Sequence, residues 1–151
     1  GYGSYYSVPA EWIHDVRKQP ATTNFPIQGK ALWEEDEDKK PFFLKIAIPN
    51  VKENWQELLG ITTSWVEQEA NNTEAWFEFG YANEMLKNYQ LALDAYQTSI
   101  SKDSNNSDAL FRSGVIENLQ GHNEEAILIH AALEKMNPAR ADELKELISM
   151  Q

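Results

Sequence analysis

Apolar residues recur at spacings of three and four over most of the chain from residue 50 onward, which is the pattern of amphipathic helices. Short polar stretches interrupt this pattern, such as Lys87-Asn88 and the run from Asp103 to Asn106. These stretches are rich in residues that favour turns and helix caps. The sequence therefore predicts six helices, which cover residues 50–69, 74–86, 89–101, 108–120, 123–135 and 138–149.

The first predicted helix begins with a capping signal. Asn50 is followed three residues later by Glu53, so that each side chain can accept a hydrogen bond from a backbone N–H at the helix start. We expect this helix to cover the N-terminal end of the helices that follow it. The last predicted helix, which starts at Pro138, is expected to cover the C-terminal end, because an uncovered end exposes apolar surface to water.

Residues 1–48 follow a different pattern, with several prolines and only short apolar runs. The run from Pro41 to Pro49 is rich in Phe and Ile and is short, which favours an extended, strand-like segment over a helix. Trp12, Trp33 and Phe42 are large apolar side chains that a solvated tail has no reason to carry. We therefore expect this extension to be mostly irregular and to wrap over the helices.

One sequence pattern occurs twice between residues 71 and 138, and the two copies are 34 positions apart. The matching pairs are Asn71–Ala75 with Asn105–Ala109, Gly80 with Gly114, and Ala92 with Ala126. Self-similarity at this period is typical of helical repeats. Two helices joined by a two-residue break must pack antiparallel. We expect Gly80 to face Ala92 at the closest approach of one pair, and Gly114 to face Ala126 in the other.

These residues resemble the tetratricopeptide repeat (TPR) family. The first unit matches its pattern at Trp76, Phe79, Gly80, Ala92, Tyr96 and Ser99, and the second at Leu110, Gly114, Gly121, Ala126 and Pro138. Several positions depart from the family pattern, namely Asn83, Ser104, Ser113, Glu117 and His130, where the family usually has Tyr, Pro, Leu, Tyr and an aromatic residue. The resemblance covers somewhat less than half of the chain.

The resemblance implies an all-α fold, a short right-handed superhelix of antiparallel helix pairs. We expect an N-terminal extension over residues 1–48 and a TPR-like domain over residues 49–151. Within that domain the leading helix covers residues 50–69, the two repeats cover 73–106 and 107–138, and the capping helix covers 138–149.

The chain is acidic, with a formal net charge of −11 that falls almost entirely in residues 51–151. An acidic surface repels phosphate, so nucleic acid is an unfavourable partner, whereas a basic protein segment is a favourable one. Plain solubility explains the same charge. The sequence shows no signal peptide and no apolar run long enough to span a membrane, so we expect a soluble protein of unspecified location.

Candidate catalytic and metal-binding groups are sparse. His14-Asp15 has no accompanying nucleophile motif, and the acidic run at residues 34–38 lacks the glycine and the ligand spacing of a calcium loop. His130 occupies a core position of the family pattern, and Gly114 and Gly121 are spaced for packing and a turn rather than for phosphate binding. No cysteine is present, so a thiolate metal site and a Cys nucleophile are excluded. From the resemblance and the lack of a catalytic constellation, we expect neither an enzyme nor a cofactor or metal site.

The resemblance places the candidate binding residues on the first helices of the repeats, which line a concave groove in the family. These residues are Glu74, Phe77, Glu78, Tyr81, Glu84, Asp108, Phe111, Arg112, Val115 and Asn118. Many relatives bind a partner's C-terminal carboxylate with Lys and Asn in this groove, but Phe77 and Tyr81 stand at those places here. The residues predict an aromatic floor with an acidic rim instead.

The function predicted from these observations is non-catalytic protein–protein interaction, as an adaptor or assembly factor that binds a peptide with an apolar anchor and basic flanks. The alternative is a self-associating structural module, whose groove is filled by its own or a neighbouring chain's N-terminal segment. Both remain open at the level of the sequence.

Overall fold

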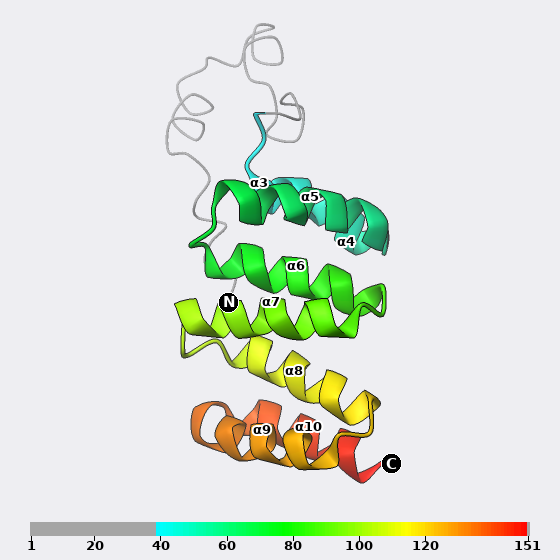
Figure 1. Cartoon of the computed structure of the whole chain (residues 1–151), viewed down its shortest axis with the longest axis vertical. Helices are drawn as coiled ribbons and strands as arrows, with labels where there is room; N and C mark the ends of the chain where they lie inside the picture. The colour runs from blue at the N-terminus through cyan, green and yellow to red at the C-terminus, as the bar shows by residue number, and fades with distance from the viewer. Residues whose placement is uncertain (1–38, 151) are drawn as a thin grey trace, which may run out of the picture. The chain divides into compact units, whose positions relative to one another are not determined.

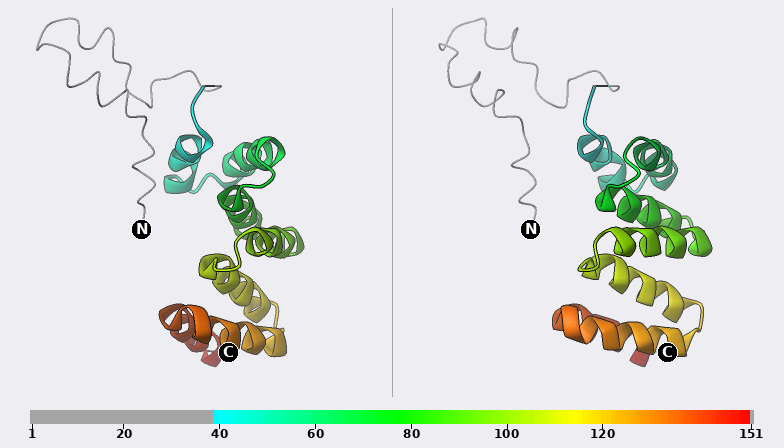
Figure 2. Two further views of the ribbon diagram at one scale, coloured as in Figure 1. Left: turned by 90° about the vertical axis from the view of Figure 1, so that its left-hand side faces the viewer. Right: turned by 60° about the vertical axis from the view of Figure 1, so that its left-hand side comes forward.

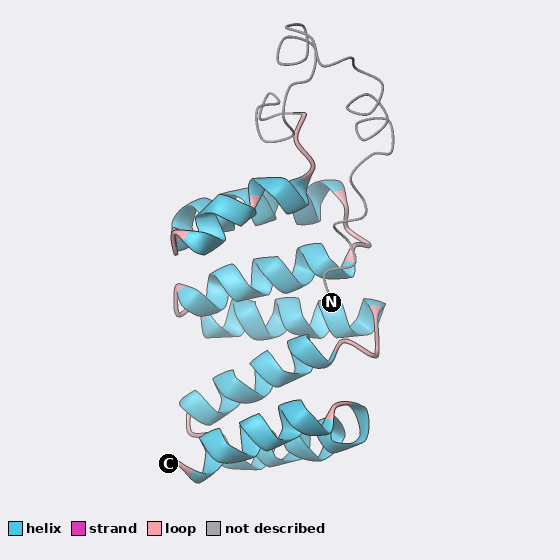
Figure 3. Ribbon diagram, turned by 180° about the vertical axis from the view of Figure 1, so that it is seen from behind, coloured by secondary structure: helices cyan, strands magenta, loops and turns pink. Residues whose placement is uncertain are grey.

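The computed structural model describes residues 39–150. Contacts divide the chain into two units, Gly1–Leu44 and Lys45–Gln151, and the second unit carries the repeats. The described part of the second unit is helical, without a strand (Figures 1 and 3). The expected positions of Trp12 and Trp33, and the candidates His14 and residues 34–38, lie outside the described residues.

The second unit consists of successive helices that stack side by side along its long axis (Figures 1 and 2). They are α4 (Ala47–Val51), α5 (Trp55–Gln68), α6 (Thr73–Met85), α7 (Tyr89–Lys102), α8 (Ser107–Leu119), α9 (Asn123–Met136) and α10 (Pro138–Ser149). Each helix from α5 onward packs against the next, and α8 also packs against α10. The all-α prediction is confirmed, and α6 to α10 begin and end within one residue of their predicted bounds.

The same cap begins each first helix of a pair. Asn72, Asn106 and Asn137 each accept a hydrogen bond through Oδ1 from the backbone N–H three residues ahead, at 3.1–3.2 Å. A side-chain acceptor here satisfies one of the N–H groups that a helix start leaves without a partner. The repeated Asn in the sequence is therefore the signal that starts α6, α8 and α10.

The leading helix was predicted to start too early. It begins at Trp55, where Asn54 Oδ1 accepts from the Glu57 N–H at 3.2 Å and Asn54 Nδ2 donates to Glu57 Oε2 at 2.9 Å. Asn50-x-x-Glu53 has the same spacing, but Glu53 has a φ of 55°, which ends helical backbone there. The helix therefore does start with an Asn-x-x-Glu cap, as predicted, but with the one at Asn54, about one turn later than Asn50.

The strand-like prediction for residues 41–49 is also wrong. This stretch forms α3 (Phe42–Lys45) and the start of α4. Pro49 is the third residue of α4, where the backbone N–H has no partner within the helix, so the missing proton costs nothing. Sequence reasoning treated both prolines as boundaries of an extended segment, although a first-turn proline is compatible with a helix.

Both glycines mark close approaches, as predicted, but against other side chains. A Cβ at Gly80 would lie 2.8 Å from Tyr96 Cε1, and one at Gly114 would lie 2.6 Å from Leu144 Cδ2. Ala92 and Ala126 are fully buried, as expected, yet neither is among the nearest atoms to the glycines. Ala92 packs instead with Tyr96, Ala109 and Ile116, so it joins the first repeat to α8.

Candidate functional site

The predicted site residues lie on α6 and α8, the first helices of the two repeats, and we call this surface the first-helix face. Their exposure differs. Glu74 and Asp108 are exposed, Phe77, Glu78, Tyr81, Arg112 and Val115 are half-buried, and Glu84, Phe111 and Asn118 are buried. The acidic rim is therefore formed by fewer residues than the sequence suggested.

Glu84 is 4% exposed and lies in a charged bridge between the repeats. Arg112 Nε donates to Glu84 Oε1 at 3.0 Å, and the guanidinium also contacts Oε2. The Tyr96 hydroxyl donates to the same Oε1 at 2.7 Å. Glu84 is thus saturated by groups of α7 and α8, and it positions Arg112 rather than contacting solvent as a rim charge.

The ionisation of this bridge is fixed by its surroundings. Burial and the Glu84 carboxylate raise the pKa of the Tyr96 hydroxyl far above its ordinary value, so it remains a donor. Burial by itself lowers the pKa of Arg112, but the hydrogen bond and charge of Glu84 together raise it above the ordinary value. Glu84 and Arg112 therefore form an ion pair, in which the Glu84 carboxylate accepts hydrogen bonds from both Arg112 and Tyr96.

Aromatic rings and guanidinium groups contact one another in a row that runs from α5 over the first-helix face to α10, and we call them the aromatic–arginine row. Trp55 packs edge-on to Tyr81, with ring centroids 5.6 Å apart. The Arg112 guanidinium lies 5.5 Å from the Tyr81 centroid and 5.9 Å from that of Phe111. Arg140 follows at 4.7 Å from the Phe111 centroid. Contacts of this type contribute about 0.5–1 kcal/mol each at exposed sites.

Arg140 belongs to this face, although sequence reasoning did not select it. It stands on α10 and bonds to Asp108 Oδ1 and Glu143 Oε2, both at 3.1 Å. The available signal was Asn137, which caps α10 as Asn72 and Asn106 cap α6 and α8. Treating α10 as a third first helix, and not only as an end cap, would have brought its residues into the candidate set.

Phe111 is 5% exposed and belongs to the core, which corrects the expectation that it faces the groove. It packs with Leu133 of α9 and with Ala141 and Leu144 of α10. Nearby, Asn118 Nδ2 donates to the Leu147 carbonyl at 3.2 Å. The covering element is α10, which packs on α8. The sequence predicted this helix as a cap on the C-terminal end, but not that it would cover Phe111.

Glu78 carries a half-buried carboxyl group, and the hydrogen bond that it accepts does little to offset the cost of burying its charge. Asn50 Nδ2 donates to Glu78 Oε1 at 3.4 Å, which is a long hydrogen bond. Burial raises the pKa of Glu78 to about 7, and the nearby Glu74 carboxylate adds to the rise while Asn50 opposes it. The charge of the first-helix face therefore changes near neutral pH.

The histidines of the described part make surface pairs. His122 Nδ1 lies 3.1 Å from Glu117 Oε2, and His130 Nδ1 lies 3.3 Å from Glu134 Oε1. Among the residues that the structure describes, no group of three or more His, Asp or Glu is arranged to hold a metal. No helix in that part has the length and apolar character needed to cross a bilayer.

No protein-family model and no curated protein matches the sequence. Solved structures do match. The TPR2B domain in the pHsp70 complex of yeast Sti1 is 17% identical, with a TM-score of 0.65 over 72% of this chain and 90% of that one. The OM64 TPR domain from Arabidopsis is 16% identical, with a TM-score of 0.67 over 80% and 98%. A chain of the CopN–Scc3 complex is 12% identical, with a TM-score of 0.61 over 89% and 88%. The chain therefore has the fold of a TPR domain, a short superhelix of helix pairs.

Proposed function

We propose that this protein is a non-catalytic protein-binding module that recognises a peptide segment on its first-helix face. The observation that carries the proposal is the aromatic–arginine row, in which Tyr81 and Arg112 remain half-exposed at the centre. Large, rigid aromatic side chains and arginine are the residue types that dominate binding energy at protein interfaces.

The comparisons support the class of function without identifying a partner. The TPR2B domain of yeast Sti1 is described as a complex with pHsp70, and the CopN–Scc3 structure is itself a complex. A shared fold does not establish a shared function. The proposal therefore depends on the side chains of this chain, and the neighbours show only that the fold occurs in such complexes.

The proposed partner has an apolar anchor and basic flanks. The anchor would rest on the half-buried rings of Phe77 and Tyr81, because Phe111 is already covered by α10. Basic flanks would meet Glu74, Glu78 and Asp108, and charges at such a rim mainly speed encounter and set specificity. Two repeats offer a limited surface, so we expect a dissociation constant on the order of micromolar. This corresponds to a binding free energy of about −8 kcal/mol.

A displayed library of random peptides, selected on the intact chain, tests this proposal. Tyr81→Ala should weaken the selected peptides at least tenfold in a fluorescence anisotropy titration. Leu91→Ala is the control, because Leu91 is 53% exposed on α7, away from this face. Equal binding of every selected peptide to parent and Tyr81→Ala would contradict the proposal. Phe111 is left unchanged, because removing its buried ring would also destabilise the fold.

Self-association is the competing function, and its readout is separate. Light scattering across a concentration series reports a concentration-dependent mass if one chain binds another. A mass that rises with concentration in the parent, and not in Tyr81→Ala, would replace peptide recognition by self-association on the same face.

A further inference from the structure

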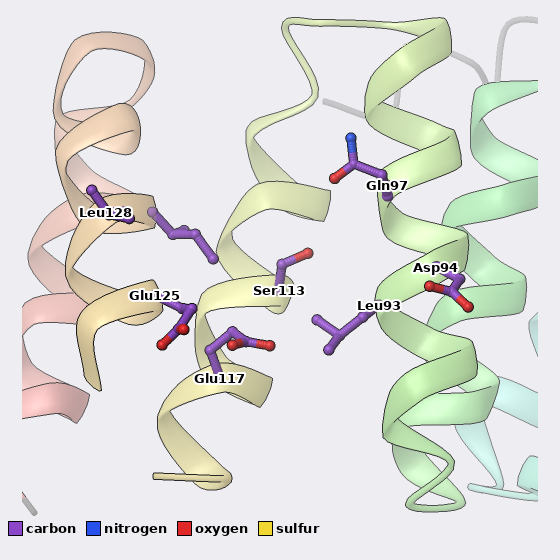
Figure 4. A pocket seen from close by; sticks show the side chains of 8 residues that line it. Leu93, Asp94, Gln97, Ser113, Glu117, Glu125 and Leu128 are labelled. Atoms are coloured by element: carbon purple, nitrogen blue, oxygen red, sulfur yellow. The ribbon is translucent and has the colours of Figure 1, made fainter. Parts of the chain in front are cut away.

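A pocket of about 430 Å³ opens between α7, α8 and α9 (Figure 4). Its apolar part is formed by Leu93 and Ile129, and Leu93 and Ser113 point toward each other from α7 and α8. This volume lies within the range of ordinary ligand pockets, which is about 300–1,000 Å³. The pocket is large enough for one large apolar side chain of a partner.

The pocket lies on the side of α8 opposite the first-helix face. Successive helical residues are rotated by about 100°, so Ser113 and Glu117 point about 200° away from Phe111 and Val115 respectively. None of the candidate residues of the first-helix face lines the pocket. A ligand in the pocket therefore leaves the first-helix face accessible.

A missing side chain helps to explain why the pocket is open. Ser113 occupies the position that Phe79 occupies 34 residues earlier, in the first repeat. Phe79 there packs edge-on to Trp76, with centroids 5.9 Å apart. The Ser113 hydroxyl instead turns back and donates to the Ala109 carbonyl of its own helix at 2.9 Å. The second repeat thus lacks a large side chain where the first has one.

The charge of the pocket is of one sign. Asp94, Glu117 and Glu125 line it, and the described residues around it include no Lys or Arg. Glu117 pairs with His122, and Asp94 accepts from Gln90 Nε2 at 3.0 Å. Glu125, in the first turn of α9, is exposed to solvent. At the apolar edge, Leu128 is 70% exposed.

We propose that this pocket is a second peptide-binding site, which accepts a Leu, Ile or Met side chain with a Lys or Arg next to it in the partner. The apolar side chain takes the space that Ser113 leaves beside Leu93 and Ile129. The cation meets Asp94 and Glu125, so charge complementarity identifies the partner as a basic amphipathic segment. The site lies beyond the proposed function of the first-helix face and does not depend on it.

Ser113→Leu fills the pocket from inside with the residue that the family pattern favours, so the variant should fold. A random displayed peptide library is selected on the parent and depleted on Ser113→Leu. The expected peptides carry an aliphatic residue next to Lys or Arg. They should bind Ser113→Leu at least tenfold more weakly and Tyr81→Ala as tightly as the parent, by fluorescence anisotropy.

A charge test and a control complete the experiment. Asp94→Asn with Glu125→Gln should weaken the same peptides and reduce the salt dependence of binding, whereas Glu124→Gln, on the neighbouring residue of α9, should change neither. Equal binding by parent and Ser113→Leu overturns the proposal, and so does the enrichment of acidic peptides. Dimerisation of the parent that Ser113→Leu abolishes also overturns it, because a second copy would then be the occupant.

Discussion

The two repeats share a backbone pattern but close their cores in different ways. In the first, Gly80 lies against Tyr96 of its own second helix, and Tyr96 is fully buried. In the second, Gly114 lies against Leu144 of α10, and His130 stands half-buried at the position equivalent to Tyr96. In the first repeat, the large side chain that packs on the glycine therefore comes from the second helix of the same repeat. In the second repeat it comes from the capping helix α10.

Glu78 and Arg112 occupy equivalent positions in the two repeats, and they also differ in the element that stabilises them. They are 34 residues apart and occupy the same place in α6 and α8. The Glu78 carboxyl group accepts a long hydrogen bond from Asn50, whereas Arg112 is paired with Glu84. The position of a side chain in the repeat therefore does not by itself determine how strongly the side chain is stabilised. Its stabilisation depends on which neighbouring element covers it.

The largest expected effect is a difference in the loss of stability between alanine variants of Tyr96 and His130, which occupy equivalent positions. Tyr96→Ala removes a fully buried ring and a donor to Glu84, and it should lower the free energy of unfolding by about 3–5 kcal/mol. His130→Ala, at the equivalent position, should cost less than about 1 kcal/mol, because His130 is half-buried with an exposed partner. Urea denaturation of both variants measures the difference. Equal losses would show that the two cores close alike.

The dependence of the second repeat on α10 is tested at Leu144. Leu144→Ala leaves a cavity against Gly114 and Phe111 and should cost about 3 kcal/mol. Leu147→Ala is the control on the same helix, and a smaller loss is expected because Leu147 is only half-buried. Thermal denaturation followed by circular dichroism measures both. If Leu144→Ala melts like the parent, the second repeat closes without the capping helix.

Glu78 gives a pH-dependent prediction. Its pKa is about 7 in the folded chain and 4.5 ordinarily, so its stabilisation of the fold is complete below pH 4.5 and is lost as the pH rises through 7. Glu78→Gln keeps the shape and removes the titration. The variant should gain on the order of 2–3 kcal/mol relative to the parent between pH 4.5 and 8. Urea denaturation at both pH values measures this gain, and Glu124→Gln, at an exposed residue of α9 that does not act on Glu78, serves as the control.

A smaller effect is expected from Ser113→Leu. Filling the pocket beside Leu93 and Ile129 adds apolar contact at a place where the first repeat already holds a phenylalanine. We expect a gain of about 1 kcal/mol in the free energy of unfolding, seen as a rise in Tm. A loss of stability would mean that Leu93 and Ile129 cannot accommodate a larger neighbour.

The sequence predicted most of the helices well because their starts carry local signals. Asn caps and apolar periodicity are properties of short stretches, so α6 to α10 were placed within one residue. The same local reasoning misread Pro49, because a proline in a first turn and a proline in an extended segment look alike in sequence. Asn50 and Asn54 were equally ambiguous, since both precede a glutamate by three residues.

The candidate site was harder to predict because it depends on packing between distant segments. Nothing local to Phe111 shows that α10 covers it, and nothing local to Glu84 shows that Arg112 and Tyr96 saturate it. The pocket beside Ser113 had a signal in the departure from the family pattern, but its walls come from α7 and α9.

The bridge from Glu84 to Arg112 and Tyr96 has a consequence for cooperativity. In a repeat array each unit contacts only its neighbours, so the coupling between units decides whether they unfold singly or together. Separating α6 from α8 here would break the hydrogen-bonded ion pair of Glu84 and Arg112, at a cost of about 1.5–3 kcal/mol. A penalty of that size disfavours a half-melted array, so the two repeats should unfold in one transition.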